Sequence, residues 1–136
     1  MIDVRVQAAD FDPGRQLARL GDLKHAGVAS FTGLLDAGDD VTGIFVDHYP
    51  ALAKAELARI ADEAAVRWPL AGLILIHRHG RFAPCDRLLF AGTAAAEPAD
   101  ALAACGFLVE ALRTRAPFWR KDLLSDGRYS WREGRG

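Results

Sequence analysis

Two prolines bracket the longest amphipathic stretch of this sequence and fix where its helix begins and ends. Proline fits the first helical position, but it has no backbone N–H and disfavours helical geometry in the residue before it. Pro50 and Pro69 therefore delimit a helix from Ala51 to about Trp68. Apolar residues recur within it at the three- and four-residue spacing of one buried helical face. They are Leu57, Ile60, Ala61, Ala64 and Trp68.

Pro98 and Pro117 bracket another helix in the same way, from Glu97-Pro98 to about Arg115. Arg113 lies on its last turn, where the helix dipole favours a cation. Arg120 and Lys121 follow on an extended segment, so a small anion could lie between helix and strand. The alternative is structural: Arg113 and Arg115 only cap the helix, and the nearby Trp119 only packs.

The other segments have strand patterns. Residues 2–7 alternate apolar and polar, as in a half-buried strand, whereas Leu73–Ile76 are all apolar, as in a central strand covered on both faces. Asp12-Pro13 begins a short helix that ends by Gly27. The predicted strands are residues 2–7, 28–35, 41–49, 73–80, 87–94, 118–121 and 128–132.

This order predicts one α+β domain over residues 1–136, with three helices and a mainly antiparallel sheet. The turn residues Asp36–Asp40 suggest that strands 28–35 and 41–49 pair as a hairpin. Ser125–Gly127 predict a final hairpin at the C-terminus.

The charge is nearly balanced overall but uneven along the chain. A net charge of −1 over 136 residues argues against a general nucleic-acid-binding protein. Seven of the 17 cations lie in the last 24 residues, against three acids there, which is a local basic patch suited to phosphate or carboxylate groups. The seven are Arg113, Arg115, Arg120, Lys121, Arg128, Arg132 and Arg135.

Other classes of site have little support in the sequence. Cys85 and Cys105 lack metal-ligand spacing and are expected to be free thiols. His77 and His79 share a strand face, but no third ligand has matching spacing, so we expect no metal. His48 is expected to have a hydrogen-bonded structural role. Without a leader or an apolar run of about 20 residues, a cytoplasmic protein that does not enter membranes is expected.

Five segments resemble, in order and spacing, the large (catalytic) subunit of molybdopterin synthase, and they span nearly the whole chain. They are residues Val28–Gly33, Asp47–Pro50, Arg67–Leu70, Ile76–Gly80 and Arg115–Lys121. The resemblance implies an α/β-hammerhead-type fold and a central homodimer that binds two copies of a ubiquitin-like sulfur carrier, giving a heterotetramer. It also implies sulfur transfer from the thiocarboxylate of the carrier's Gly-Gly tail to cyclic pyranopterin monophosphate, in molybdenum cofactor biosynthesis and without a bound cofactor.

The same resemblance assigns roles to residues. Phe31 is expected to line the channel for the carrier tail. Arg115 and Arg135 are expected to bind substrate, with Arg135 reaching the neighbouring subunit's site. Arg113 and Arg120 occupy the positions of two family lysines and are the catalytic candidates.

The chain departs from the family pattern at several of these positions. Glu97-Pro98 replace a His-Arg pair, and Asp36 or a neighbour replaces an arginine. A guanidinium stays protonated and cannot act as an amine nucleophile, which leaves Lys121 as the nearby amine and the third catalytic candidate. Strand alternation would point Lys121 away from Arg120, so it can take this role only if a bulge or twist redirects it. Two hypotheses follow: an active synthase subunit with altered residue roles, or a non-catalytic homologue that keeps dimerisation and carrier docking.

Overall fold

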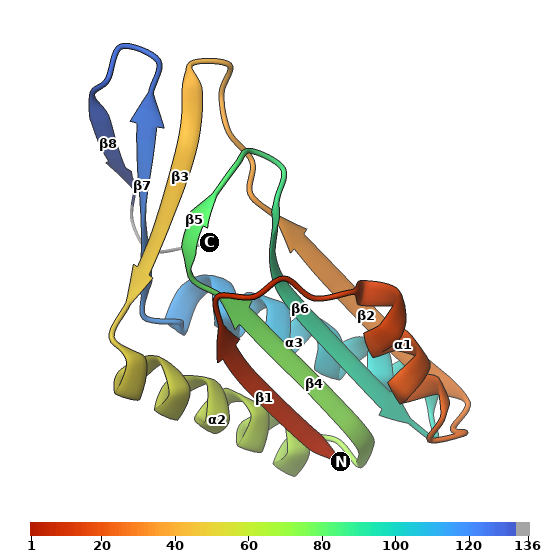
Figure 1. The fold of residues 1–136 in the computed structure, drawn as a ribbon. Coiled ribbons are helices and arrows are strands. Elements are labelled where there is room, and N and C mark those ends of the chain that lie inside the picture. The colour runs from red at the N-terminus through yellow and green to blue at the C-terminus, as the bar shows by residue number, and fades with distance from the viewer. Residues whose placement is uncertain (133–136) are drawn as a thin grey trace.

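The computed structural model describes residues 1–132, and within them the chain forms three helices and two four-stranded sheets (Figure 1). The elements are β1 (Ile2–Gln7), α1 (Pro13–Gly21), β2 (Gly27–Leu34), β3 (Val41–His48), α2 (Pro50–Arg67), β4 (Leu70–Arg78), β5 (Gly80–Phe82), β6 (Arg87–Ala95), α3 (Pro98–Arg115), β7 (Phe118–Leu124) and β8 (Tyr129–Arg132). The predicted α+β class is confirmed. None of these helices combines the length and hydrophobicity that crossing a membrane requires.

The main sheet has the strand order β1-β4-β6-β2, with β1 and β4 parallel and the other pairs antiparallel. Its β4 strand is buried on both faces, as the absence of alternation predicted. Leu73 and Leu75 join the core under α2 and α3, whereas Ile74 and Ile76 join the core under α1. The apolar run therefore supplies two cores because successive side chains point to opposite faces of the sheet.

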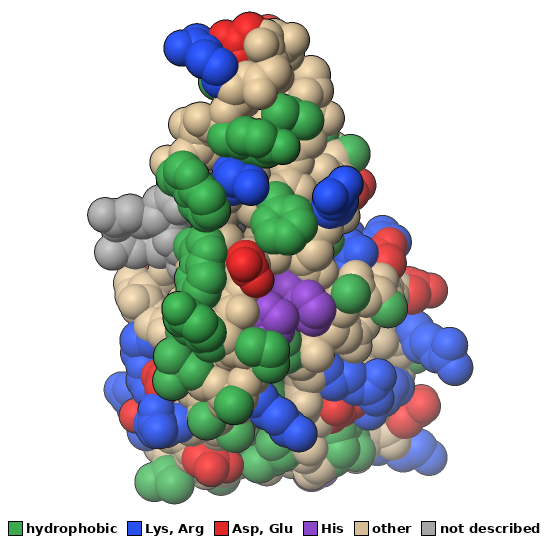
Figure 2. All heavy atoms as spheres, turned by 60° about the vertical axis from the view of Figure 1, so that its left-hand side comes forward, with side chains coloured by type: hydrophobic (Ala, Val, Ile, Leu, Met, Phe, Trp, Pro, Cys, Tyr) green, Lys and Arg blue, Asp and Glu red, His purple; other side chains and the backbone are tan. Residues whose placement is uncertain are grey.

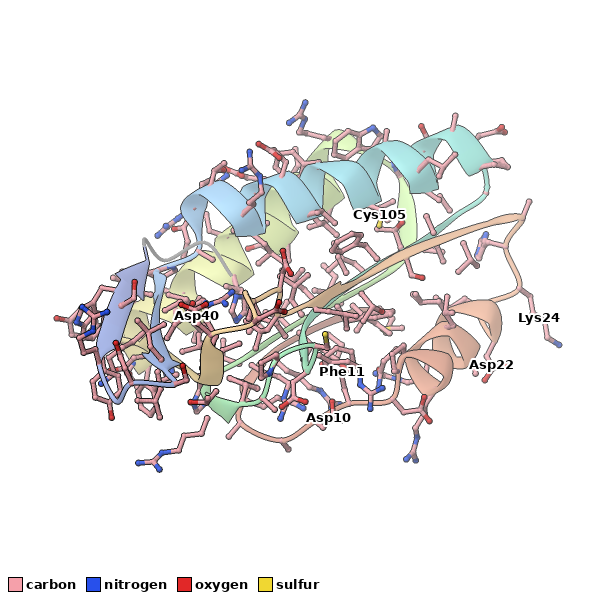
Figure 3. The ribbon with its side chains drawn as sticks, turned by 90° about the horizontal axis from the view of Figure 1, so that it is seen from above. Asp10, Phe11, Asp22, Lys24, Asp40 and Cys105 are labelled. Atoms are coloured by element: carbon pink, nitrogen blue, oxygen red, sulfur yellow. The ribbon has the colours of Figure 1, made fainter. Side chains whose placement is uncertain are left out.

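Helices cover both faces of the main sheet. Figure 3 shows α2 and α3 on one side, with Cys105 beneath α3, and α1 on the other side next to Phe11. Helix α1 lies so close that a Cβ at Gly92 of β6 would be 2.6 Å from Cδ1 of Leu20. Glycine on β6 thus makes room for the helix.

The second sheet has the order β5-β3-β7-β8 and is antiparallel throughout. The predicted hairpin between residues 28–35 and 41–49 is wrong, because β2 pairs with β6 and β3 pairs with β5 and β7. Leu35 explains the divergence: its N–H donates to the Asp86 carbonyl and its carbonyl accepts from Cys85 N–H. The chain stays on the β6 side through Leu35 and then enters the other sheet.

Two further turns shape the second sheet. The predicted strand through Gly80 is interrupted: β4 ends at Arg78, and Gly80, at φ +117°, starts β5 in the second sheet. A side chain would strain that backbone, so glycine suits this corner. The predicted C-terminal hairpin is confirmed as β7–β8, with Gly127 at φ +86° in its turn.

Candidate functional site at the junction of the two sheets

A set of near-parallel rings joins the two sheets where α3 ends and β7 begins. His77 of β4 stacks on Phe118 of β7, with ring centroids 3.6 Å apart and planes at 10°. Phe118 also stacks on His48 of β3 at 5.5 Å, and His48 stacks on His79 at 4.1 Å. The rings come from β3, β4, β7 and the β4–β5 link, so they fix the start of β7 against both sheets.

Burial keeps the innermost histidine neutral. His77 is 1% exposed, and desolvation lowers its pKa to about 4, opposed by its hydrogen bond to the Arg78 carbonyl. Its Nδ1 lies 2.9 Å from that carbonyl oxygen, and since a carbonyl only accepts, Nδ1 carries the proton. Desolvation, followed by the charge of His48, also lowers the pKa of His79.

His48 differs from its predicted hydrogen-bonded role. Its Nδ1 is buried, and within the described part of the chain it has no hydrogen-bond partner. The ring is held by stacking between His79 and Phe118 instead. Among residues 1–132, no three His, Cys, Asp or Glu side chains are arranged to hold a metal ion.

Arg120 lies on the inner face of β7 and is 4% exposed. Its Nε donates to Asp122 Oδ1 at 2.7 Å, and its Nη2 donates to Asp122 Oδ2 at 3.2 Å. Nη2 also donates to the backbone carbonyl of Asp36 at 2.5 Å. The guanidinium therefore binds two protein groups, the carboxylate of Asp122 and the backbone carbonyl of Asp36. Asp36 lies where the sequence departs from the family pattern.

The two arginines at the end of α3 have different surroundings. Arg113 is exposed, and among residues 1–132 it pairs only with Glu110 on its own helix, through Nη2 at 2.9 Å and Nε at 3.2 Å. Arg115 is held by α2, where Glu56 accepts from Nε and Nη2 at 3.0 and 2.8 Å and Glu63 pairs with Nη1. No hydrogen bond or ion pair within residues 1–132 joins Arg113 to Arg120.

Lys121 faces the opposite side of β7 from Arg120, as strand alternation predicted. Its Nζ lies 4.3 Å from the ring centroid of Tyr129, 5.2 Å from that of Trp131 and 5.5 Å from that of Phe45. It also lines an open pocket of about 420 Å³ that includes Arg81. Figure 2 shows this face, where basic groups lie among hydrophobic side chains beside a histidine patch.

The remaining candidates lie away from this junction or outside the described residues. Phe31 is 44% exposed on β2, an edge strand of the main sheet. Glu97 and Pro98 are exposed at the N-terminal end of α3, and Arg113 is near its other end. A helix rises about 1.5 Å per residue, so these departures are separated by roughly 24 Å along α3. Arg135 lies outside the described residues.

The comparisons with known proteins identify the family. A family model described as MoaE protein matches residues 6–115. This chain belongs to the MoaE family. A molybdopterin synthase catalytic subunit from Pseudomonas aeruginosa is 40% identical to it, over 97% of this chain and 91% of that protein.

Solved MoaE-type structures share the fold. A molybdopterin biosynthesis MoaE protein from Burkholderia ambifaria superposes with a TM-score of 0.84 at 36% identity, covering 100% of this chain and 92% of that one. A Helicobacter pylori structure, described as a complex of subunits 1 and 2 of molybdopterin-converting factor, gives 0.73 at 18% identity, over 96% and 88% of the chains, and supports the fold alone. The family resemblance inferred from the sequence is confirmed.

Sequence reasoning missed two features of this MoaE junction. The ring set was missed because its members are far apart in the chain. The contact of Arg120 with Asp36 was missed because it uses a backbone carbonyl, which any residue supplies. The Arg120–Asp122 pair did leave a signal: opposite charges two residues apart share a strand face.

Proposed function

We propose that this chain is the catalytic subunit of a molybdopterin synthase and transfers sulfur from a thiocarboxylated small subunit to cyclic pyranopterin monophosphate. The observation that carries the proposal is the 40% identity to a named catalytic subunit over 97% of this chain. A match of that extent includes the segment from α3 into β7, where the candidate site residues lie.

Arg113 is the cation best suited to contact the anionic substrate. An exposed ion pair contributes little, so its contact with Glu110 can be exchanged for a phosphate or carboxylate at small cost. A guanidinium binds such groups through two parallel N–H donors. Arg113 therefore acts by holding and neutralising the substrate, because it has no ready proton to give up at neutral pH.

Lys121 is the amine candidate near the junction. Its side chain is on the outer face of β7, among the rings of Phe45, Tyr129 and Trp131. Rings stabilise the ammonium form through their negative faces. A direct role in the chemistry would require Lys121 to leave these rings, so we assign it to the outer surface rather than to the substrate contact proposed for Arg113.

The proposed assembly is a homodimer with two small subunits, working in the cytoplasm. The Helicobacter pylori neighbour, whose likeness to this chain shows the fold alone, is itself described as a complex of two subunits, and we extend a small-subunit partner to this chain through its family membership. A second copy of this chain is what the family resemblance implies. Phe31 for the carrier tail, and Arg115 and Arg135 for substrate, remain predictions.

The direct test is sulfur transfer in vitro. The purified chain is mixed with a thiocarboxylated small subunit and the pterin precursor, and dithiolene formation is followed after conversion to a fluorescent derivative. We expect product that depends on the chain and on the thiocarboxylate. Binding of the small subunit without any product would contradict the proposal and support the non-catalytic homologue.

A further inference from the structure

The connector between the two sheets is held at three places. The connector, residues 35–40, joins β2 of the main sheet to β3 of the second sheet. At its start, Leu35 is buried and hydrogen-bonded to the β5–β6 turn. At its end, Val41 N–H donates to the Gly38 carbonyl at 3.0 Å, and Ser125 N–H donates to the Asp40 carbonyl at 2.8 Å. Between them, Arg120 binds the Asp36 carbonyl.

The middle contact is built differently from the other two. Leu35 and Asp40 are fixed by backbone hydrogen bonds, whereas Asp36 is fixed by a side chain that is itself buried and oriented by Asp122. Burying a guanidinium is costly unless its donors are well paired. The arrangement meets this condition, since both Nε and Nη2 donate to the Asp122 carboxylate and Nη2 also reaches the carbonyl.

We infer that Arg120 is a positioning residue: held by Asp122, it fixes the connector against β7 at the carbonyl of Asp36 before substrate binds. The inference rests on the proposed function, because Arg120 follows Phe118 of the ring set by two residues on β7, and its carbonyl partner belongs to the connector. It gives Arg120 a role other than the catalytic one expected from the sequence. The N–H donors of Arg120 bind protein groups rather than the substrate, and the connector is therefore already in position when the substrate binds.

Lysine cannot take over this role. The fork of a guanidinium presents separate, fixed donors to a carboxylate and to a second acceptor, whereas an ammonium is one compact centre on a flexible stem. Arg120→Lys keeps the charge and the interaction with Asp122 but loses simultaneous contact with both acceptors. The connector then spends part of its time detached.

Hydrogen exchange on the free protein tests the contact by which Arg120 fixes the connector, here called the clamp, without any substrate. In Arg120→Lys, the amides of Val41 and Ser125 should exchange about tenfold faster, whereas the amide of Ile74 in β4 keeps its protection. The matched control is Arg128→Lys, which changes an exposed Arg–Asp pair of the same two-residue spacing, with Nε 2.6 Å from Asp126 Oδ2. It should leave all three amides unchanged.

Sulfur transfer separates positioning from catalysis. If the connector is detached for part of the time, the apparent affinity is reduced by the fraction that stays attached, so KM should rise while kcat is kept. A fall in kcat with unchanged exchange at Val41 and Ser125 would overturn the inference and make Arg120 catalytic. Faster exchange at Ile74 as well would also overturn it, as a general loss of stability. If the wild-type chain transfers no sulfur, the proposed function fails, and exchange alone still decides whether the clamp exists.

Discussion

Arg113 at the end of α3 and Arg120 in β7 lie on either side of Pro117, yet their environments are opposite. Arg113 is exposed and pairs with a neighbour on its own helix, whereas Arg120 is 4% exposed and binds a carboxylate and a carbonyl. By resemblance, both stand where the family has lysine. The difference shows that arginine, at two positions where the family has lysine, is an exposed cation at one and a buried cation paired with protein groups at the other.

Removing the buried guanidinium should have the largest effect on stability. Arg120→Ala deprives the buried carboxylate of Asp122 of its two-donor partner, which typically costs about 3 kcal/mol or more. Urea unfolding at pH 7 measures the change. The control is Arg128→Ala, whose pair with Asp126 is exposed and should contribute little. Equal losses in the two variants would remove the distinction between buried and exposed pairs.

The second-largest effect should be a loss of unfolding free energy at acid pH, caused by the buried His77. The folded-state pKa of His77 is about 4, below its ordinary value of 6.5, so the unfolded chain takes up a proton first as pH falls. Stability is therefore present above pH 6.5 and is lost between about 6.5 and 4. From pH 7 to pH 5 the loss due to His77 should be about 2 kcal/mol.

The variant His77→Gln identifies the source of that pH dependence. Because glutamine does not titrate, the part of the loss between pH 7 and pH 5 that belongs to His77 should disappear. His79, whose pKa is also lowered, contributes in the same direction and stays in place as the background. An unchanged slope of unfolding free energy against pH would contradict the neutral, buried His77.

Arg115 should have an intermediate effect. It bridges α3 to α2 through Glu56 and Glu63, with its side chain one-third exposed. Networked but solvent-screened pairs of this kind contribute about 1 kcal/mol. Arg115→Gln should lower the urea midpoint slightly, and the loss should shrink at high salt. A loss as large as that of Arg120→Ala would place Arg115 on the buried side of the comparison.

Arg113→Ala should have the smallest effect on the fold and a clear effect on the ligand. Its pair with Glu110 is on the surface, so the urea midpoint should not change measurably. If Arg113 holds the anionic substrate, KM for the pterin should rise by about tenfold, in line with the loss of one charge-assisted contact. Steady-state kinetics measure this, with Arg128→Ala again as control. An unchanged KM would leave Arg113 as a helix-end cation only.

Local patterns predicted the helices and the covered strand, because their causes lie within a few residues. Pro50, Pro98 and Pro117 bound α2 and α3, and the unbroken apolar run of β4 predicted burial on both faces. Pairing was harder. The turn chemistry of residues 36–40 is the same whether the flanking strands pair or part, and the deciding hydrogen bonds of Leu35 come from Cys85 and Asp86, far along the chain.

The candidate site divides in the same way. Alternation along β7 was sufficient to place Arg120 and Lys121 on opposite faces. It did not indicate which face is buried, and burial is what places the Arg120 guanidinium against Asp122 and the Asp36 carbonyl. The neutral state of His77 likewise depends on burial against Phe118, which comes from another strand. The burial and the contacts of these two side chains depend on segments that are distant in the sequence, so local sequence patterns do not predict them.

The most direct test of the account compares turnover in Arg113→Lys and Arg120→Lys, measured side by side with the thiocarboxylated small subunit. The two variants make the same chemical change at the exposed and at the buried position. We predict that Arg113→Lys retains or gains sulfur transfer, since a cation remains at the substrate, and that Arg120→Lys loses efficiency through a raised KM. A gain of turnover from Arg120→Lys alone would contradict the account, because it would show that position 120 acts on the substrate rather than on the connector.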